Sequence, residues 1–190
     1  MTVIRQDDLI DSVADALQFI SYYHPVDFVQ AVHQAYEREQ NPAARDAMAQ
    51  ILINSRMCAL GHRPICQDTG IVTVFLKVGM NVTWDATMSV TDMVNEGVRR
   101  AYTHPDNVLR ASILEDPAGA RKNTRDNTPA VIHYEIVEGD TVDVQVAAKG
   151  GGSENKSKLV MLNPSDSIVD WVVKTVPTMG AGWCPPGMLG

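Results

Sequence analysis

The chain has 190 residues, of which 45% are hydrophobic and 21% are charged. That composition suits one globular domain or slightly more, and the chain is long enough to bury a core. Sixteen Lys and Arg residues stand against 23 Asp and Glu residues, so the net charge is −7, and no basic run offsets it, which argues against a nucleic-acid partner.

Neither membrane insertion nor export is indicated. No apolar run approaches the roughly 18 residues of a membrane span, and residues 1–8 lack a basic region followed by an apolar block. We therefore expect a cytoplasmic protein without a membrane partner. The three cysteines, Cys58, Cys66 and Cys184, are an odd number for a disulfide framework and suit a reducing compartment.

The first part of the chain predicts three helices. Apolar residues recur at helical spacing over residues 7–22. A second helix begins at Pro25, which suits a first helical position, and ends in the polar stretch 37–41. The third is capped by Asn41 and ends at Gly61. Residues 1–62 are therefore predicted to be a helical subdomain.

Residues 63–190 are predicted to be an α/β part, with a mixed sheet flanked by helices. The elements expected there, in chain order, are a strand at 71–78 buried on both faces, helices at 89–102 and 108–114, a β-hairpin of strands 130–137 and 141–147, and a helix from Asn163. Between the second of these helices and the hairpin lies a long polar loop, 115–129, of the kind that is usually functional or disordered. The fold class is α/β or α+β.

The loop at residues 61–70 joins the third helix to the first strand, a favoured place for a binding loop. Cys66, Gln67 and Asp68 supply a soft metal ligand or nucleophile, a two-way hydrogen bonder and a carboxylate in succession. The tripeptide alone fits a helix-capping turn with a half-buried cysteine equally well. Cys58 lies on an apolar helical stripe, which favours a core thiol.

Two further loops are candidates to meet this one. The glycines that follow Lys149 permit an anion-binding nest of backbone N–H groups, although a plain flexible turn fits as well. Cys184 lies between Trp183 and two prolines, and a rigid loop of this kind favours a cluster or metal ligand. A structural zinc site is disfavoured because no closely spaced pair of cysteines exists. A cysteine nucleophile assisted by His62 stays open.

Four stretches together resemble one family. Residues 51–70, 121–129, 148–155 and 182–186 resemble the N-terminal region of class I fumarase, the iron–sulfur fumarate hydratase. The L-tartrate dehydratase α-subunit type shares the resemblance, which covers essentially the whole chain.

The resemblance implies a [4Fe–4S] cluster held by three cysteines, with one iron open to the substrate. Cys66 and Cys184 match two of the ligands, and the third is expected beyond residue 190. Cys58 is a poor substitute because of its place on the helix stripe. This chain is accordingly expected to be the N-terminal part of a longer enzyme and to be inactive alone.

The resemblance also implies substrate-side residues. Asp68 is expected to be catalytic, although the base itself is expected beyond residue 190. Arg110 is our choice for binding a substrate carboxylate, with Arg121 and Arg125 as competitors, because a dicarboxylate favours bidentate arginine. The other expected substrate contacts are Gln67, Gly150 and Gly151.

The expected reaction is the reversible hydration of fumarate to L-malate by the full-length protein, which we expect to be a homodimer. L-tartrate dehydratase and a mesaconate-type hydratase are alternatives within the class. A different alternative is a non-catalytic assembly module that binds a partner subunit.

Overall fold

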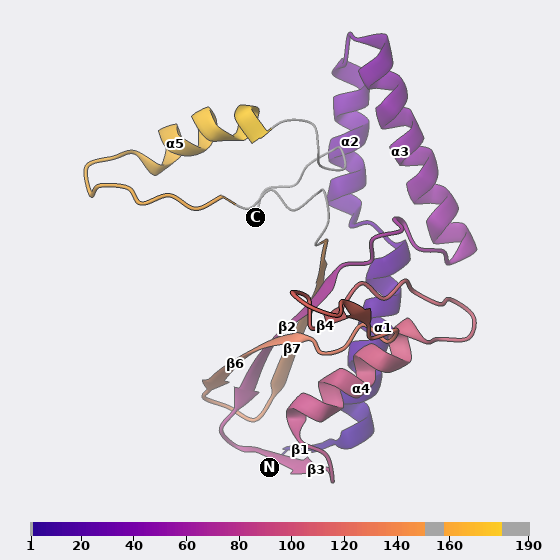
Figure 1. Cartoon of the computed structure of the whole chain (residues 1–190), viewed down its shortest axis with the longest axis vertical. Coiled ribbons are helices and arrows are strands. Elements are labelled where there is room, and N and C mark those ends of the chain that lie inside the picture. The colour runs from indigo at the N-terminus through magenta and orange to yellow at the C-terminus, as the bar shows by residue number, and fades with distance from the viewer. Residues whose placement is uncertain (1, 151–157, 180–190) are drawn as a thin grey trace. The chain divides into compact units, whose positions relative to one another are not determined.

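The computed structural model describes residues 2–150 and 158–179. The chain forms two compact units, Met1–Lys149 and Gly150–Gly190, and each is described by itself. The first unit combines helices with a mixed sheet (Figure 1), which confirms the predicted fold class. The boundary predicted at residue 62 stays a prediction.

The three N-terminal helices lie close to where the sequence predicts them. They are α1 (Gln6–Tyr22), α2 (Val26–Arg38) and α3 (Pro42–Gly61). Pro25 is the N-cap of α2 rather than its first residue. The Asn41 side chain accepts hydrogen bonds from the backbone N–H groups of Ala43 and Ala44 at 2.9 and 3.3 Å, so it caps α3 as expected. In Figure 1, α2 and α3 form an antiparallel pair.

The core of this unit forms between α1, the fourth helix α4 (Val90–Tyr102) and the strand β2 (Ile71–Gly79). The helices contribute the apolar faces that the sequence predicts, and a side chain at Gly97 would lie 2.6 Å from the carbonyl oxygen of Ile10. Glycine therefore allows α1 and α4 to pack closely. The core residues are Leu9, Ile10, Val13, Leu17, Val72, Val74, Leu76, Met93, Val94, Val98, Ala101, Tyr102 and Leu109.

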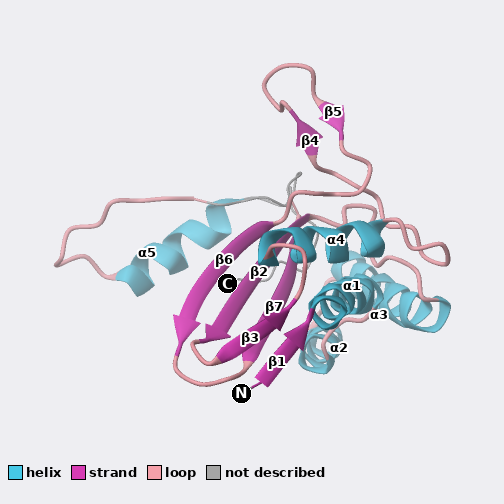
Figure 2. Ribbon diagram, turned by 90° about the horizontal axis from the view of Figure 1, so that it is seen from below, coloured by secondary structure: helices cyan, strands magenta, loops and turns pink. Residues whose placement is uncertain are grey.

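The main sheet has the order β6-β2-β7, with β6 at Val131–Val137 and β7 at Val142–Lys149. The strand β2 pairs with β6 in parallel and with β7 antiparallel. The predicted hairpin of adjacent strands is therefore wrong, because β2 lies between β6 and β7 (Figure 2). The end of β2 and the turn after it also bond to the segment that connects β6 to β7. The Gly79 N–H donates to the Thr141 carbonyl at 2.9 Å, and the Asn81 N–H donates to the Gly139 carbonyl at the same distance.

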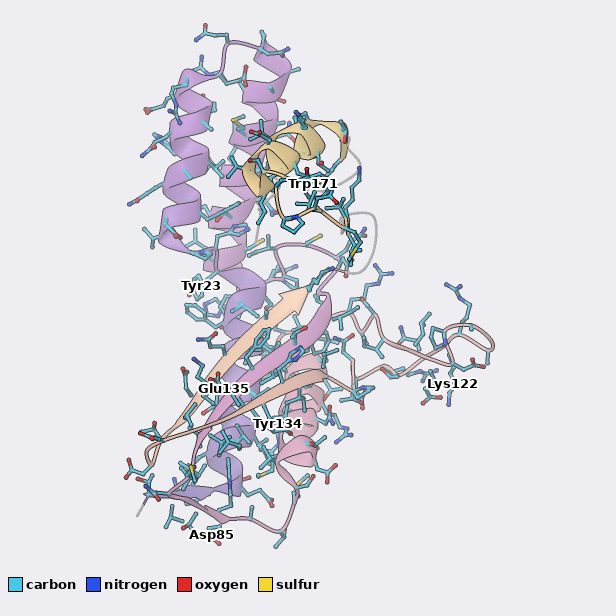
Figure 3. All side chains as sticks on the ribbon, turned by 90° about the vertical axis from the view of Figure 1, so that its left-hand side faces the viewer. Tyr23, Asp85, Lys122, Tyr134, Glu135 and Trp171 are labelled. Carbon is cyan, nitrogen blue, oxygen red and sulfur yellow. The ribbon has the colours of Figure 1, made fainter. Side chains whose placement is uncertain are left out.

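The strand β2 is buried on one face only in this unit, so the prediction of two buried faces is wrong. Val72, Val74 and Leu76 are at most 1% exposed, whereas Phe75, which points the other way, is 45% exposed. On β6, Tyr134 and Glu135 point to opposite faces because they are adjacent (Figure 3). The Tyr134 hydroxyl lies 2.8 Å from Thr91 Oγ1 on α4.

The helix predicted at 108–114 is also wrong. Residues 108–113 are irregular and lead into a small antiparallel pair, β4 (Leu114–Glu115) and β5 (Lys122–Asn123), which projects from the rest of the unit in Figure 2. Lys122 marks this arm in Figure 3. The backbone groups of residues 110–113 bond to other segments instead of forming a helical ladder: Thr69 donates to Arg110, and Asn127 accepts from residues 112 and 113.

A second parallel pair joins β1 (Thr2–Arg5) to β3 (Val82–Asp85). In the second unit, α5 (Ile168–Thr175) is followed by the short 3₁₀ helix Val176–Met179. The helix α5 starts after its cap Ser167, later than the Asn163 that the sequence predicts. Within the described ranges, none of the helices is long and apolar enough to cross a membrane.

Candidate functional site

The loop that carries Cys66, Gln67 and Asp68 runs from the end of α3 to the start of β2. His62 begins it in a left-handed conformation, with φ of 46°, which ends the helix. The His62 ring stacks on Tyr22 of α1, with 4.8 Å between ring centroids. The Ile65 N–H donates to the Ser21 carbonyl at 2.8 Å. The first half of the loop is therefore fixed on the C-terminal end of α1.

The second half of the loop is fixed on α4 and on the 110–113 segment. The Tyr102 hydroxyl donates to the Thr69 carbonyl at 2.9 Å, and Thr69 Oγ1 donates to the Arg110 carbonyl at 2.5 Å. The carboxylate of Asp68 accepts the Gly70 N–H at 3.0 Å. These contacts leave the three candidate side chains on a loop whose backbone is held on both sides.

Gly70 brings the end of β7 against this loop. Its φ is +82°, and a side chain there would lie 2.7 Å from the Lys149 backbone, so only glycine fits. Lys149 is the last residue of β7 and directly precedes the glycine run. The sequence predicts that the loop beginning at Lys149 approaches the Cys66 loop. Within the first unit, Lys149 itself does so.

A cavity of about 210 Å³ lies beside the loop. Cys66, Asp68 and Thr69 line it together with residues of α1 and α4 and with Leu109 and Ala148, the helix residues being Leu17, Ile20, Ser21 and Tyr102. His24 also lines it. Burial lowers the pKa of His24 and raises the pKa of Tyr102, so both groups favour the neutral form there. The cavity thus combines an apolar wall with a polar rim that contains Cys66 and Asp68.

The two described cysteines differ as the sequence predicts. Cys66 is an exposed free thiol, whereas Cys58 is buried on α3. Burial raises the pKa of the Cys58 thiol, and its Sγ lies 3.6 Å from Asn54 Oδ1 and from the Pro64 carbonyl. Cys58 therefore has the surroundings of a core thiol.

The other predicted site residues lie in different parts of the chain, and two of them are outside the described residues. Gln67 and Arg110 are exposed, and the Arg110 backbone contacts the loop through Thr69. Arg121 and Arg125 are exposed on the 115–129 loop, with positive φ values of 52° and 69°. Gly150 begins the second unit, and Gly151 and Cys184 lie outside the described residues.

Cys66 fits one ligand position of an iron–sulfur cluster, because it is an exposed thiol on a fixed loop beside a cavity. Over residues 2–150 and 158–179, no three His, Cys, Asp or Glu side chains are grouped closely enough to hold a metal ion.

Three residues that position the loop were not predicted from the sequence: Thr69, Tyr102 and Asn127. Asn127 is 0% exposed, and its Nδ2 donates to the Gly70 carbonyl at 2.9 Å. The only signal in the sequence was its place in a long polar loop, which did not indicate a buried side chain.

Comparison with known proteins identifies the family of the chain. The family model described as fumarate hydratase (Fumerase) matches residues 10–190. The chain belongs to the fumarate hydratase family. The match confirms the family resemblance of the sequence motifs.

Curated relatives match nearly the whole chain. It is 31% identical to the putative L(+)-tartrate dehydratase subunit alpha of Methanocaldococcus jannaschii, over 95% of this chain and 65% of that protein. It is 25% identical to the L(+)-tartrate dehydratase subunits alpha of Escherichia coli K12 and Shigella sonnei, over 96% of this chain and 60% of each. The chain thus spans less than two thirds of the length of these curated relatives.

Proposed function

We propose that the complete protein is a hydro-lyase that hydrates fumarate reversibly to L-malate. The observation that carries the proposal is the joint exposure of Cys66 and Asp68 to one cavity, on a loop held by α1 and α4, in a chain that belongs to the fumarate hydratase family. The small volume of the cavity, about 210 Å³, suits a small substrate.

In this proposal a [4Fe–4S] cluster is the cofactor. Cys66 and Cys184 would hold it together with a third thiolate from elsewhere in the complete protein. When bound, the cluster would supply an open iron that acts as a Lewis acid on the substrate. The exposed, fixed position of Cys66 supports its role as a ligand, and the buried position of Cys58 argues against Cys58 as the third one.

The chain's own residues would bind and orient the diacid. Hydration adds the hydroxyl of water to C2 and a proton to C3. Asp68, at the cavity rim, would act beside the reacting carbons as a hydrogen-bond acceptor. Arg110 would bind one carboxylate with a bidentate geometry, and Gln67, Gly150 and Gly151 would contact the remaining substrate oxygens.

L-tartrate dehydration is the second candidate, because the curated relatives carry that name. The test is an anaerobic assay of the reconstituted complete protein with fumarate, L-malate, L-tartrate and mesaconate. We expect the highest kcat/KM for the fumarate and L-malate pair. A higher kcat/KM for L-tartrate or mesaconate would overturn the substrate proposal, and no turnover of any diacid would overturn the hydro-lyase proposal.

The proposal extends to oligomeric state. We propose that the complete protein is a homodimer, as expected from the family resemblance. Sedimentation of the complete protein measures this directly, and a monomer at micromolar concentration would contradict it.

A further inference from the structure

The side chain of Asn127 connects two segments that are far apart in the sequence. Its Nδ2 donates to the Gly70 carbonyl at 2.9 Å. Its Oδ1 accepts the N–H groups of Ser112 and Ile113 at 2.7 and 3.3 Å. The side chain is 0% exposed although its loop is otherwise largely exposed. A buried amide with this many partners is costly to replace.

A second connection lies one residue away. Thr69 Oγ1 donates to the Arg110 carbonyl at 2.5 Å. The consecutive residues Thr69 and Gly70 are thus tied to both ends of the 110–113 segment. Because Asp68 directly precedes Thr69, the two ties fix the backbone of Asp68 relative to that of Arg110.

Asn127 is itself held in place by its neighbours. Its φ of 62° is a left-handed conformation, which asparagine adopts more readily than most residues. The adjacent Asp126 accepts hydrogen bonds from Thr128 and, at 3.1 Å, from Arg99 Nε on α4. The residue before Asn127 is therefore anchored to α4, which also carries Tyr102.

We propose that Asn127 is a positioning residue that holds Arg110 at a fixed distance from the Cys66–Asp68 loop. The inference rests on the proposed function, in which a diacid is bound at one end by Arg110 while its reacting carbons lie beside Asp68. The trans double bond of fumarate fixes the distance between its carboxylates, so fumarate can satisfy both contacts only when their spacing is fixed. Misplacement by about 1 Å can cost about 100-fold in rate.

The test is a double-mutant cycle on kcat/KM for fumarate in the complete enzyme. N127A should lower kcat/KM by about 10- to 100-fold, chiefly through KM. In an R110A background the same substitution should have less than about a threefold effect, because Asn127 acts through Arg110. Independent effects that multiply in N127A/R110A would overturn the inference.

The matched control is Asn123→Ala. Asn123 lies in the same loop and donates to the Ala111 carbonyl at 2.9 Å. Among the described residues, no hydrogen bond joins Asn123 to residues 66–70. We expect N123A to leave KM within about twofold of wild type, as for surface changes away from a site. An N123A effect as large as that of N127A would show general loosening of the arm and would overturn the inference.

Two further measurements keep the test decisive. N127D keeps Oδ1 and the side-chain shape but removes the donor to Gly70, and T69V removes the other tie. If N127A does not fold, the cycle is run with N127D and T69V, and additivity with R110A overturns the inference there too.

Hydrogen exchange at Ser112 and Ile113 should accelerate at least about tenfold in N127A and not in N123A. Unchanged exchange in N127A would show that Asn127 does not hold the 110–113 segment and would overturn the inference.

The exchange measurement separates the two hypotheses. If wild type turns over no diacid, the proposed function fails, and with it the catalytic part of the inference, while exchange still tests the tie. If wild type hydrates fumarate but N127A and R110A act independently, the inference alone fails.

Discussion

The Tyr102 hydroxyl, at the end of α4, donates a 2.9 Å hydrogen bond to the Thr69 carbonyl, across 33 residues of sequence. Tyr102 is 1% exposed, so removing its hydroxyl takes away a hydrogen bond whose donor residue is buried. We expect Tyr102→Phe to lower the free energy of unfolding by about 1–3 kcal/mol, measured by urea denaturation. Tyr134→Phe is the control, because that hydroxyl is on a residue 48% exposed and should cost less than about 0.5 kcal/mol.

Tyr102 should also give the chain a pH dependence. Burial, the largest cause, raises the pKa of this phenol in the folded state, so the unfolded state ionises first as pH rises. Its contribution to stability is fully present below its unfolded pKa, about 10, and is lost as pH rises through the folded pKa. Wild type should therefore lose stability more steeply above pH ~10 than Tyr102→Phe does. Parallel curves for the two proteins would contradict this.

Gly97 lies in the contact between α1 and α4 and should tolerate alanine less well than Gly61 at the end of α3. An added Cβ would lie 2.6 Å from the Ile10 carbonyl and 2.8 Å from Val13 Cβ, so the two helices must separate. We expect Gly97→Ala to lower the free energy of unfolding by about 1–3 kcal/mol. At Gly61, the nearest atom to such a Cβ is Arg63 Cγ at 3.8 Å. Gly61→Ala should therefore be neutral or stabilising by up to about 1 kcal/mol, and equal losses in both variants would refute the prediction.

The helices α1 to α4 were predictable because their signals are local. Asn41 caps α3 and Ser89 caps α4 through their own side chains, and the apolar spacing of α1 identifies its buried face. The mispredictions have long-range causes. The order β6-β2-β7 depends on β2 lying, along most of its length, between two strands that are neighbours in sequence. The segment 110–113 is not helical because its backbone partners, Thr69 and Asn127, come from other parts of the chain.

The residues of the candidate site were also predictable only where their signals are local. Cys66, Gln67 and Asp68 are visible in sequence because their chemistry lies in the side chains themselves. Tyr102 and Asn127 act by bonding to backbone carbonyls of the loop from 33 and 57 residues away. A pattern of residue types does not encode such pairings, and Tyr102 reads simply as the last residue of an amphipathic helix.

The two described cysteines should differ in reactivity on the native chain. Cys66 is exposed, whereas Cys58 is 6% exposed and burial raises its pKa, which lowers the thiolate fraction that reacts. With iodoacetamide at pH 8, we expect Cys58 to be alkylated at least about 100-fold more slowly than Cys66 until the chain unfolds. Peptide mass spectrometry assigns each site. Rapid native labelling of Cys58 would contradict its place in the core.

The same difference predicts the effect of each thiol on the proposed cluster. In the complete enzyme, Cys66→Ser should remove the cluster absorbance and the activity, and Cys184→Ser should do the same. Cys58→Ser should keep both, since a core thiol supplies no ligand. Anaerobic iron and sulfide analysis of the three variants measures this. Loss of the cluster in Cys58→Ser, with the cluster intact in Cys184→Ser, would reverse the ligand assignment.

Replacing Asp68 with asparagine removes the charge of this side chain and keeps its shape. Its Oδ1 accepts the Gly70 N–H at 3.0 Å, and asparagine retains an oxygen there, so Asp68→Asn should preserve the loop and the cluster absorbance. The negative charge beside the reacting carbons is lost while the shape is kept, and we expect kcat for fumarate hydration to fall by at least about tenfold. Asp143→Asn, on an exposed position of β7, is the matched control and should keep wild-type kcat. Normal turnover in Asp68→Asn would leave this carboxylate with only a role in the turn that leads into β2.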